Sequence, residues 1–104
     1  MSKPIRAVVV RGIEGGEAKV NAIIDTGSFY TILRADRVPK ETTVATYAKR
    51  RTFGTARKGG RLHVTGAVHL QIRLEGHWID GDALVSPDLG TDMLIGAGLM
   101  QMWD

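Results

Sequence analysis

The 104-residue sequence contains no cysteine and only three prolines, and 6% of its residues are aromatic. The absence of cysteine excludes disulfides and thiolate metal sites. No apolar run approaches the roughly 20 residues that span a bilayer, and residues 1–4 are not followed by the apolar stretch of a signal peptide. We therefore expect no membrane segment in this chain. A cytoplasmic location is the default expectation, either as made or after release from a larger precursor.

What is present fits an ordinary soluble protein, with 43% hydrophobic and 24% charged residues. A chain of this length is expected to form one domain, residues 1–104, with a single core. A domain of about 100 residues leaves little room for a deep internal cavity. A large substrate cleft is therefore easier to build between two copies of the chain than within one.

The formal net charge is +3, and basic residues gather in one segment. They are Lys49, Arg50, Arg51, Arg57, Lys58 and Arg61. Such a cluster is typical of a solvated hairpin, although it can also attract acidic peptides or bind phosphate backbones. A protein that stacks on nucleic-acid bases interleaves aromatic with basic residues, and only Tyr47 and Phe53 are present here. We therefore expect no nucleic-acid partner.

Metal and other cofactor sites have no sequence support. His63, His69 and His77 lack the spacing of metal ligands. The aspartates between positions 80 and 92 do not fit a calcium-binding loop, which needs glycine and glutamate at fixed places. Phosphate-loop and serine-hydrolase motifs are absent as well. We expect no cofactor and no metal.

Apolar residues mostly recur at every second position, which is the spacing of β-strands. The predicted strands cover residues 5–11, 18–24, 31–33, 43–52, 68–74, 78–85 and 93–95. Turn signals lie at residues 14–17 and at Gly76. Residues 34–42 and 86–91 are expected to be loops, residues 53–60 a loop or hairpin tip, and residues 99–103 a short helix. Many short strands with one helix predict an all-β sandwich or closed barrel.

One ionisable residue, Asp25, directly follows the apolar strand that ends at Ile23 and Ile24. Burying a lone carboxylate is unfavourable unless the group is paired or hydrogen-bonded. Thr26 and Ser28 place hydroxyls around Asp25, and Gly27 allows a close backbone approach. An Asx-type turn that merely ends a strand is the alternative interpretation, because these residue types are common in such turns.

A second motif, Met93-Leu94-Ile95-Gly96, repeats the run of two apolar residues that leads into the turn at Asp25. With both motifs at this spacing, the chain resembles the retroviral-type aspartic peptidases. Residues 53–103 are especially similar to the retroviral-like protease domain of DNA-damage-inducible ubiquitin-shuttle proteins. The resemblance implies a single-domain, retropepsin-like closed β-barrel or sandwich with a flap hairpin and one short C-terminal helix. It also implies a homodimer that cleaves peptide or protein substrates.

The resemblance assigns roles to the residues of the Asp25 turn. Asp25 is implied to be the catalytic carboxylate and to share a proton with its copy in the second subunit, so that the pair activates a water. Thr26 is implied to brace the two turns against each other, and Gly27 to offer its backbone to the substrate. Ser28 is implied to donate to the outer oxygen of Asp25. That bond favours the ionised form and predicts a more acidic activity optimum than in family members with alanine at this position.

The flap is expected to span residues 50–64, and its tip is either Gly54 or the pair Gly59 and Gly60. Glycines suit a lid that bends and lies close to a peptide backbone. Substrate-binding residues are predicted in the flap and around the two motifs. They are Phe29, Tyr30, Phe53, Gly54, Gly59, Gly60, Val85 and Ile95. Ile32 is a further candidate for the pocket lining. Phe29, Tyr30, Ile32, Val85 and Ile95 fit a core position equally well.

The chain departs from the family at several positions. Phe29 and Ala97 stand where many retroviral members carry an acidic residue and an arginine that pair, so that brace is missing. Gly98 weakens the start of the helix. The family usually adds a C-terminal strand at the dimer interface, and this sequence lacks it. Three alternatives are open: residues 1–10 form the interface instead, the dimer is weak, or this chain is a trimmed form of the protein. A catalytically weak or inactive module with this fold, which only dimerises or binds peptides, is the main alternative function.

Overall fold

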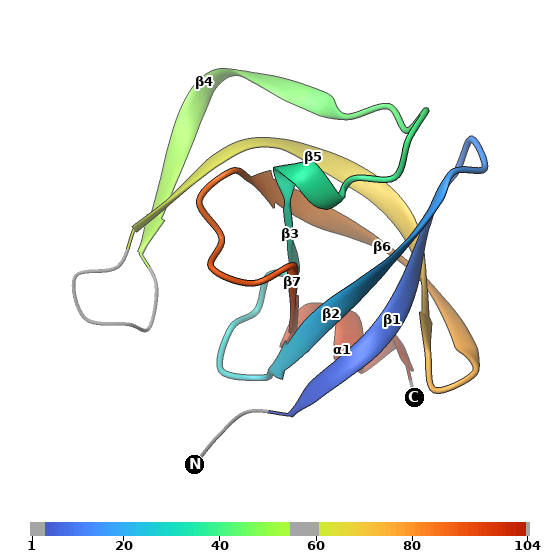
Figure 1. The fold of residues 1–104 in the computed structure, drawn as a ribbon. Helices are drawn as coiled ribbons and strands as arrows, with labels where there is room; N and C mark the ends of the chain where they lie inside the picture. Colours follow the sequence, from blue (N-terminus) through green and yellow to red (C-terminus); the bar gives the residue numbers. More distant parts are fainter. Residues whose placement is uncertain (1–3, 55–60, 104) are drawn as a thin grey trace.

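The computed structural model describes residues 4–54 and 61–103, and the side chains of Phe53, Arg61, Met102 and Trp103 are outside the description. The described residues form seven strands and two short helices, and Figure 1 shows how they are arranged. The elements are β1 (Ile5–Gly12), β2 (Glu17–Asp25), β3 (Ile32–Arg34), the 3-10 helix η1 (Ala35–Arg37), β4 (Ala45–Gly54), β5 (Arg61–Leu74), β6 (His77–Ser86), β7 (Met93–Gly96) and α1 (Ala97–Trp103). The all-β class with one short terminal helix is confirmed.

The strands form one sheet in the order β1-β2-β7-β3-β6-β5-β4, and an additional pairing of β1 with β5 closes it into a barrel. Six strands make up the closed ring. Strand β4 is not part of the ring and pairs only with residues 61–67 of β5. Closure removes the open edges that a twisted sheet would otherwise expose. The predicted closed barrel is therefore present.

The barrel interior is filled by alternate residues of the strands, as a period of two requires. In β1 and β2, for example, Val8, Val10, Val20 and Ala22 are 0–3% exposed, and the intervening residues face outward. The largest fully buried side chains include Leu33, Leu70, Ile72, Met93 and Ile95. A second, smaller apolar cluster joins Ile32, Leu62 and Leu89, with Leu84 packed against it.

The hairpin turn between β5 and β6 consists of Glu75 and Gly76. Their φ angles are 50° and 82°, which is the pair of positive values that a tight two-residue turn needs. Asn or Asp normally precedes glycine in such turns, and here Glu75 adopts the left-handed conformation instead. This turn sets the register of the β5–β6 pairing. Leu74 pairs with His77, and the pairs that follow lie in the same register as far as Gly66 and Val85.

Strand β5 starts at Arg61, seven residues before the predicted strand, and runs as one long curved strand across the molecule (Figure 1). Gly66 explains how the strand passes over its neighbour, because a methyl group at Gly66 would lie 2.6 Å from the carbonyl oxygen of Ala45. Only glycine allows β4 to approach this closely. Glycine has no side chain to contribute to an alternation of apolar and polar residues. Gly66 therefore interrupts the alternating pattern, and the sequence did not predict residues 61–67 as part of the strand.

Strands β4 and β5 form the hairpin that was expected as the flap, and Arg51 to Gly54 pair with Arg61 to Val64. The pairing shifts register between Thr46 and Arg51, which marks a bulge and bends the strand. The predicted strand at residues 43–52 lies two residues further on. Gly59 and Gly60, one of the two candidate tips, lie outside the described residues, and Gly54 ends β4.

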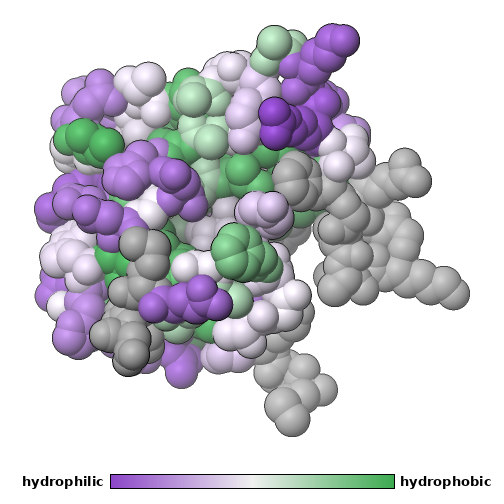
Figure 2. Space-filling view, turned by 180° about the vertical axis from the view of Figure 1, so that it is seen from behind, coloured by the Kyte–Doolittle hydropathy of each residue, from purple (hydrophilic) through white to green (hydrophobic). Residues whose placement is uncertain are grey.

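The face of the molecule opposite to the view of Figure 1 carries apolar residues in small areas that are separated by hydrophilic side chains (Figure 2). Large apolar patches on soluble proteins usually mark interaction sites, and this face presents none among the described residues. No helix in the described part of the chain is long and apolar enough to cross a membrane.

Candidate active site

Asp25 is the last residue of β2, where the barrel strand gives way to a loop. Strands β2 and β7 run parallel, and their register sets Ile24 beside Ile95 and Asp25 beside Gly96. The two motifs of the sequence are therefore neighbours in one sheet. Asp25 is only 8% exposed, so its carboxylate is held at the edge of the core rather than out in solvent.

The backbone of the loop holds the carboxylate. The N–H of Gly27 donates to Oδ1 of Asp25 at 3.0 Å, and the N–H of Ser28 donates to the Asp25 carbonyl oxygen at 3.1 Å. Hydrogen bonds from backbone N–H groups stabilise an ionised carboxylate. Thr26 and Gly27 themselves are exposed, so the tip of the turn is open to another molecule.

The hydroxyl of Ser28 donates to the carbonyl oxygen of Tyr30 at 3.3 Å. The resemblance instead assigned this hydroxyl to the outer oxygen of Asp25. The Tyr30 carbonyl is thus an alternative acceptor within the same loop. The Ser28–Asp25 bond stays a prediction for the assembled protein.

Gly96 provides the space in which the loop crosses β7. A methyl group there would lie 2.4 Å from the carbonyl oxygen of Tyr30 and 2.6 Å from that of Phe29. Both contacts are with backbone, so no side-chain movement could relieve them. The glycine of the second motif is therefore needed where the loop passes the sheet.

Thr31 is a site residue that the sequence analysis did not single out. It is 4% exposed, and its Oγ1 accepts a hydrogen bond from the N–H of Gly96 at 3.2 Å. Its carbonyl oxygen accepts from the N–H of Leu84 at 2.9 Å. Thr31 thus ties the far end of the Asp25 loop to both β7 and β6. The signal in the sequence was a single hydroxyl before the apolar pair Ile32-Leu33.

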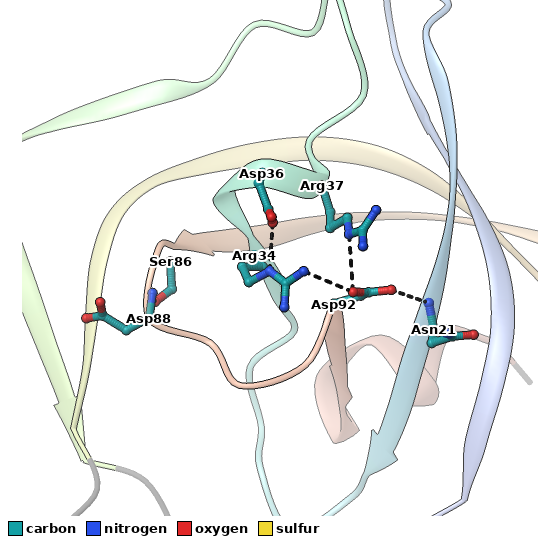
Figure 3. Close-up of polar contacts among 7 residues, drawn as sticks. All are labelled: Asn21, Arg34, Asp36, Arg37, Ser86, Asp88 and Asp92. Atoms are coloured by element: carbon teal, nitrogen blue, oxygen red, sulfur yellow. Dashed lines mark hydrogen bonds and ion pairs between the residues drawn. The ribbon is translucent and has the colours of Figure 1, made fainter.

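Asp92 joins three elements around the start of β7 (Figure 3). Its Oδ2 accepts from the backbone N–H of Asn21 in β2 at 3.0 Å. Its Oδ1 accepts from Arg34 Nη2 and from Arg37 Nε, each at 3.2 Å. The backbone N–H of Arg34 also donates to the Asp92 carbonyl oxygen at 2.9 Å. Asp92 therefore fixes β3 and β2 against the strand that carries Gly96.

Two other aspartates form separate pairs with histidines. Nδ1 of His63 in β5 lies 2.5 Å from Oδ2 of Asp88, which also accepts from the His63 backbone N–H at 3.1 Å. The His63 side chain is the main reason why the pKa of Asp88 is below its ordinary value. Nδ1 of His69 lies 2.7 Å from Oδ1 of Asp82 across the β5–β6 pairing. No group of His, Asp and Glu in the described residues could hold a metal ion.

Phe29 and Tyr30 are 61% and 51% exposed and meet edge to face, with ring centroids 5.4 Å apart. Together with Thr31 they line a shallow surface pocket, whose other lining residues are Gly81, Asp82, Gly98 and Leu99. These come from β6 and α1. The substrate role predicted for the two aromatic residues remains a prediction.

Val85 and Ile95 were predicted to line a substrate pocket, but the structure buries both. They are 4% and 0% exposed and belong to the main core, so neither lines an open surface in the described chain. Strand alternation explains the difference, because the neighbouring residues Leu84 and Leu94 point to the opposite face. Both of these leucines are partly exposed. Phe53 lies in β4, but its side chain is outside the description. Gly59 and Gly60 are outside the described residues altogether.

Comparison with solved structures identifies the fold. The chain is similar to the protease of EIAV complexed with the inhibitor HBY-793, with 17% sequence identity and a TM-score of 0.65 over 96% of this chain and 86% of that chain. It is also similar to the retroviral protease-like domain of Ddi1 from Leishmania major, with 19% identity and a TM-score of 0.63 over 97% of this chain and 77% of that chain. No protein-family model matches the sequence, and no curated protein shows significant sequence similarity to it.

Proposed function

The chain has the fold of the retroviral proteases, and we propose that it is one subunit of a homodimeric aspartic endopeptidase. Each subunit supplies one Asp25, and the two carboxylates face each other across the two-fold axis. The observation that carries this proposal is the position of Asp25. Its carboxylate is buried at the end of β2 beside Gly96 and accepts a backbone N–H bond, while the turn around it is open.

The proposed chemistry follows from two carboxylates held a few ångström apart. They cannot both ionise easily, so they share one proton, and their titrations belong to the pair. The ionised carboxylate takes a proton from a water, which attacks the scissile carbonyl carbon. The protonated carboxylate donates to the carbonyl oxygen, and a proton then passes to the leaving amine. The attacking group is water, so no covalent acyl-enzyme forms.

The other residues of the turn have positioning and binding roles in this proposal. Thr26, which is exposed at the tip, hydrogen-bonds to its copy in the second subunit. Gly27 presents its backbone to the substrate, and Ser28 supports the carboxylate. The β4–β5 hairpin acts as the flap over an extended peptide. Of the flap residues that the sequence assigns to the substrate, Phe53 and Gly54 end β4, and Gly59 and Gly60 lie outside the described residues.

Exposed apolar side chains near Asp25 support a second copy as the partner. Ile5 is 61% exposed and pairs with Ile23, two residues before Asp25. Phe29 and Tyr30, which follow the turn, are also largely exposed. Association with a second copy would remove this apolar surface from water, which favours assembly. Leu84 and Leu94, rather than their buried neighbours, are the proposed lining of the cleft.

Digestion of a mixed peptide library at several pH values tests the proposal. We expect cleavage with a bell-shaped pH profile in the acidic range, since one carboxylate must be ionised and the other protonated. Asp25→Asn should lower the cleavage rate by at least about 10³-fold. Asp36→Asn is the matched control, because that carboxylate is 67% exposed on η1 and lies outside the site.

An intact fold that cleaves no peptide at any pH would instead indicate the alternative, a module that dimerises or binds peptides. In that case the Asp25→Asn protein should bind peptides as well as the unmodified chain does. Peptide binding without cleavage, measured by fluorescence anisotropy, would separate this alternative from the peptidase.

A further inference from the structure

The loop that carries Asp25 rests on the first residues of α1. The N–H of Ala97 donates to the carbonyl oxygen of Ser28 at 2.7 Å, and the N–H of Gly98 donates to that of Phe29 at 3.0 Å. N–H groups in the first turn of a helix have no partner within the helix. Two consecutive carbonyls of the loop thus satisfy two consecutive donors of α1.

Gly98 also lies against the side chain of Phe29. A methyl group at Gly98 would lie 2.9 Å from Cζ and 3.1 Å from Cε2 of the Phe29 ring, and 3.0 Å from the Phe29 carbonyl oxygen. Carbon atoms in good contact are about 3.5–4.0 Å apart. A larger residue at position 98 would therefore displace the ring, the loop or the helix.

We propose that the Phe29 ring on Gly98 positions the Asp25 loop, an inference that rests on the proposed function. The contact holds residues 28 and 29 against α1, and the adjacent Gly27 N–H holds Oδ1 of Asp25. A shift of the loop would move the carboxylate relative to its copy. Phe29 and Gly98 are thus positioning residues, and the aromatic residue at 29 acts on the loop through its packing.

The variant Gly98→Ala tests the contact between Gly98 and the Phe29 ring, because the contact decides whether Tm falls or rises. Alanine is a better helix former than glycine, so Gly98→Ala would raise Tm if nothing lay against this position. With the ring in place, we expect Tm to fall by about 4 °C or more. Gly90→Ala is the control, because no atom lies within 4 Å of a methyl group placed there. A Tm that rises in Gly98→Ala would overturn the proposal.

Kinetics on a cleaved peptide tests the positioning role. We expect Gly98→Ala to lower kcat by about 10-fold to 100-fold at a temperature well below its Tm, because small displacements of reacting groups have effects of this size. KM should change by less than about twofold, since the substrate contacts remain. A lower Tm with wild-type kcat would mean that the contact is only structural, and a change confined to KM would mean that position 98 acts on substrate binding. Either result would contradict positioning.

The double variant Phe29→Ala/Gly98→Ala provides the rescue. Removing the ring takes away two of the three short contacts of the new methyl group and leaves the one with the Phe29 carbonyl oxygen. Gly98→Ala should therefore lower Tm less in the Phe29→Ala background than in the unmodified chain. Strictly additive Tm changes would overturn the ring-on-glycine contact. If the unmodified chain cleaves no peptide, the proposed function fails and the positioning role fails with it. The Tm comparison still decides whether the contact exists.

Discussion

Asp25 and Gly96 lie side by side in the parallel pairing of β2 and β7, although they are far apart in the sequence. The strand pairing holds Asp25 in place, and the lack of a side chain at Gly96 leaves space for the loop that follows Asp25 to cross the sheet. One residue thus carries the proposed chemistry while the other makes its loop possible. The relationship turns two weak sequence motifs into one site.

Gly96→Ala should destabilise the fold. The added methyl group would overlap the backbone of Phe29 and Tyr30, and overpacking of this kind typically costs about 1–3 kcal/mol. Urea unfolding followed by circular dichroism measures the loss. Gly90→Ala, which meets open space, should leave the free energy of unfolding within about 0.5 kcal/mol of the unmodified value. Equal effects of the two substitutions would contradict the role given to Gly96.

Asp92→Ala should cost about 1–3 kcal/mol of stability, because it leaves Nη2 of the partly buried Arg34 and the Asn21 N–H without their acceptor. Asp36→Ala is a matched control that removes the other carboxylate bound to Arg34. Asp36 is 67% exposed, whereas Asp92 is 16% exposed. Exposed ion pairs contribute about 0–1 kcal/mol, so the control should change little. An Asp36→Ala loss as large as that of Asp92→Ala would show that the cluster around Asp92 is not a brace.

The His63–Asp88 pair predicts a pH-dependent part of the stability. The His63 side chain, followed by its backbone N–H, lowers the pKa of Asp88 below its ordinary value. A depressed carboxyl pKa contributes stability that is present above the unfolded value and is lost as pH falls through the folded value. Asp88→Asn should therefore be less stable than the unmodified chain at pH 6, and the difference should shrink below about pH 3.8. A difference that stays constant down to pH 2 would refute the pairing.

Ser28→Ala should move the acidic limb of the activity profile to higher pH. If the Ser28 hydroxyl turns from the Tyr30 carbonyl to Asp25 in the assembled enzyme, it stabilises the ionised carboxylate, and its removal disfavours that form. Rates of peptide cleavage between about pH 3 and pH 7 measure the shift. A profile that Ser28→Ala leaves unchanged would show that the hydroxyl stays with Tyr30.

Much of the fold follows from local pattern. Alternation in β1, β2 and β6 and the Gly76 turn are visible in the sequence. The turn at Asp25 stands out because a carboxylate directly follows an apolar strand. These features depend on neighbours in the chain, and their physical causes act over a few residues.

Other features depend on contacts that local pattern does not encode. Asp92 meets Arg34 and Asn21 only because β7 inserts between β2 and β3. The early start of β5 is hidden at Gly66, where the neighbouring backbone occupies the place of a side chain. The choice between core and pocket for Ile95 required the register of β7, because a shift of one residue reverses which side chains face inward.

The central claim is that two copies bring their Asp25 carboxylates together, and a crystal structure of the protein bound to a peptide-like inhibitor tests it most directly. We predict a dimer in which the two carboxylates face each other about 3 Å apart across a two-fold axis. Bound inhibitor should lie between them and the β4–β5 hairpins. A monomer with inhibitor bound, or a dimer that leaves the two Asp25 side chains far apart, would contradict the account.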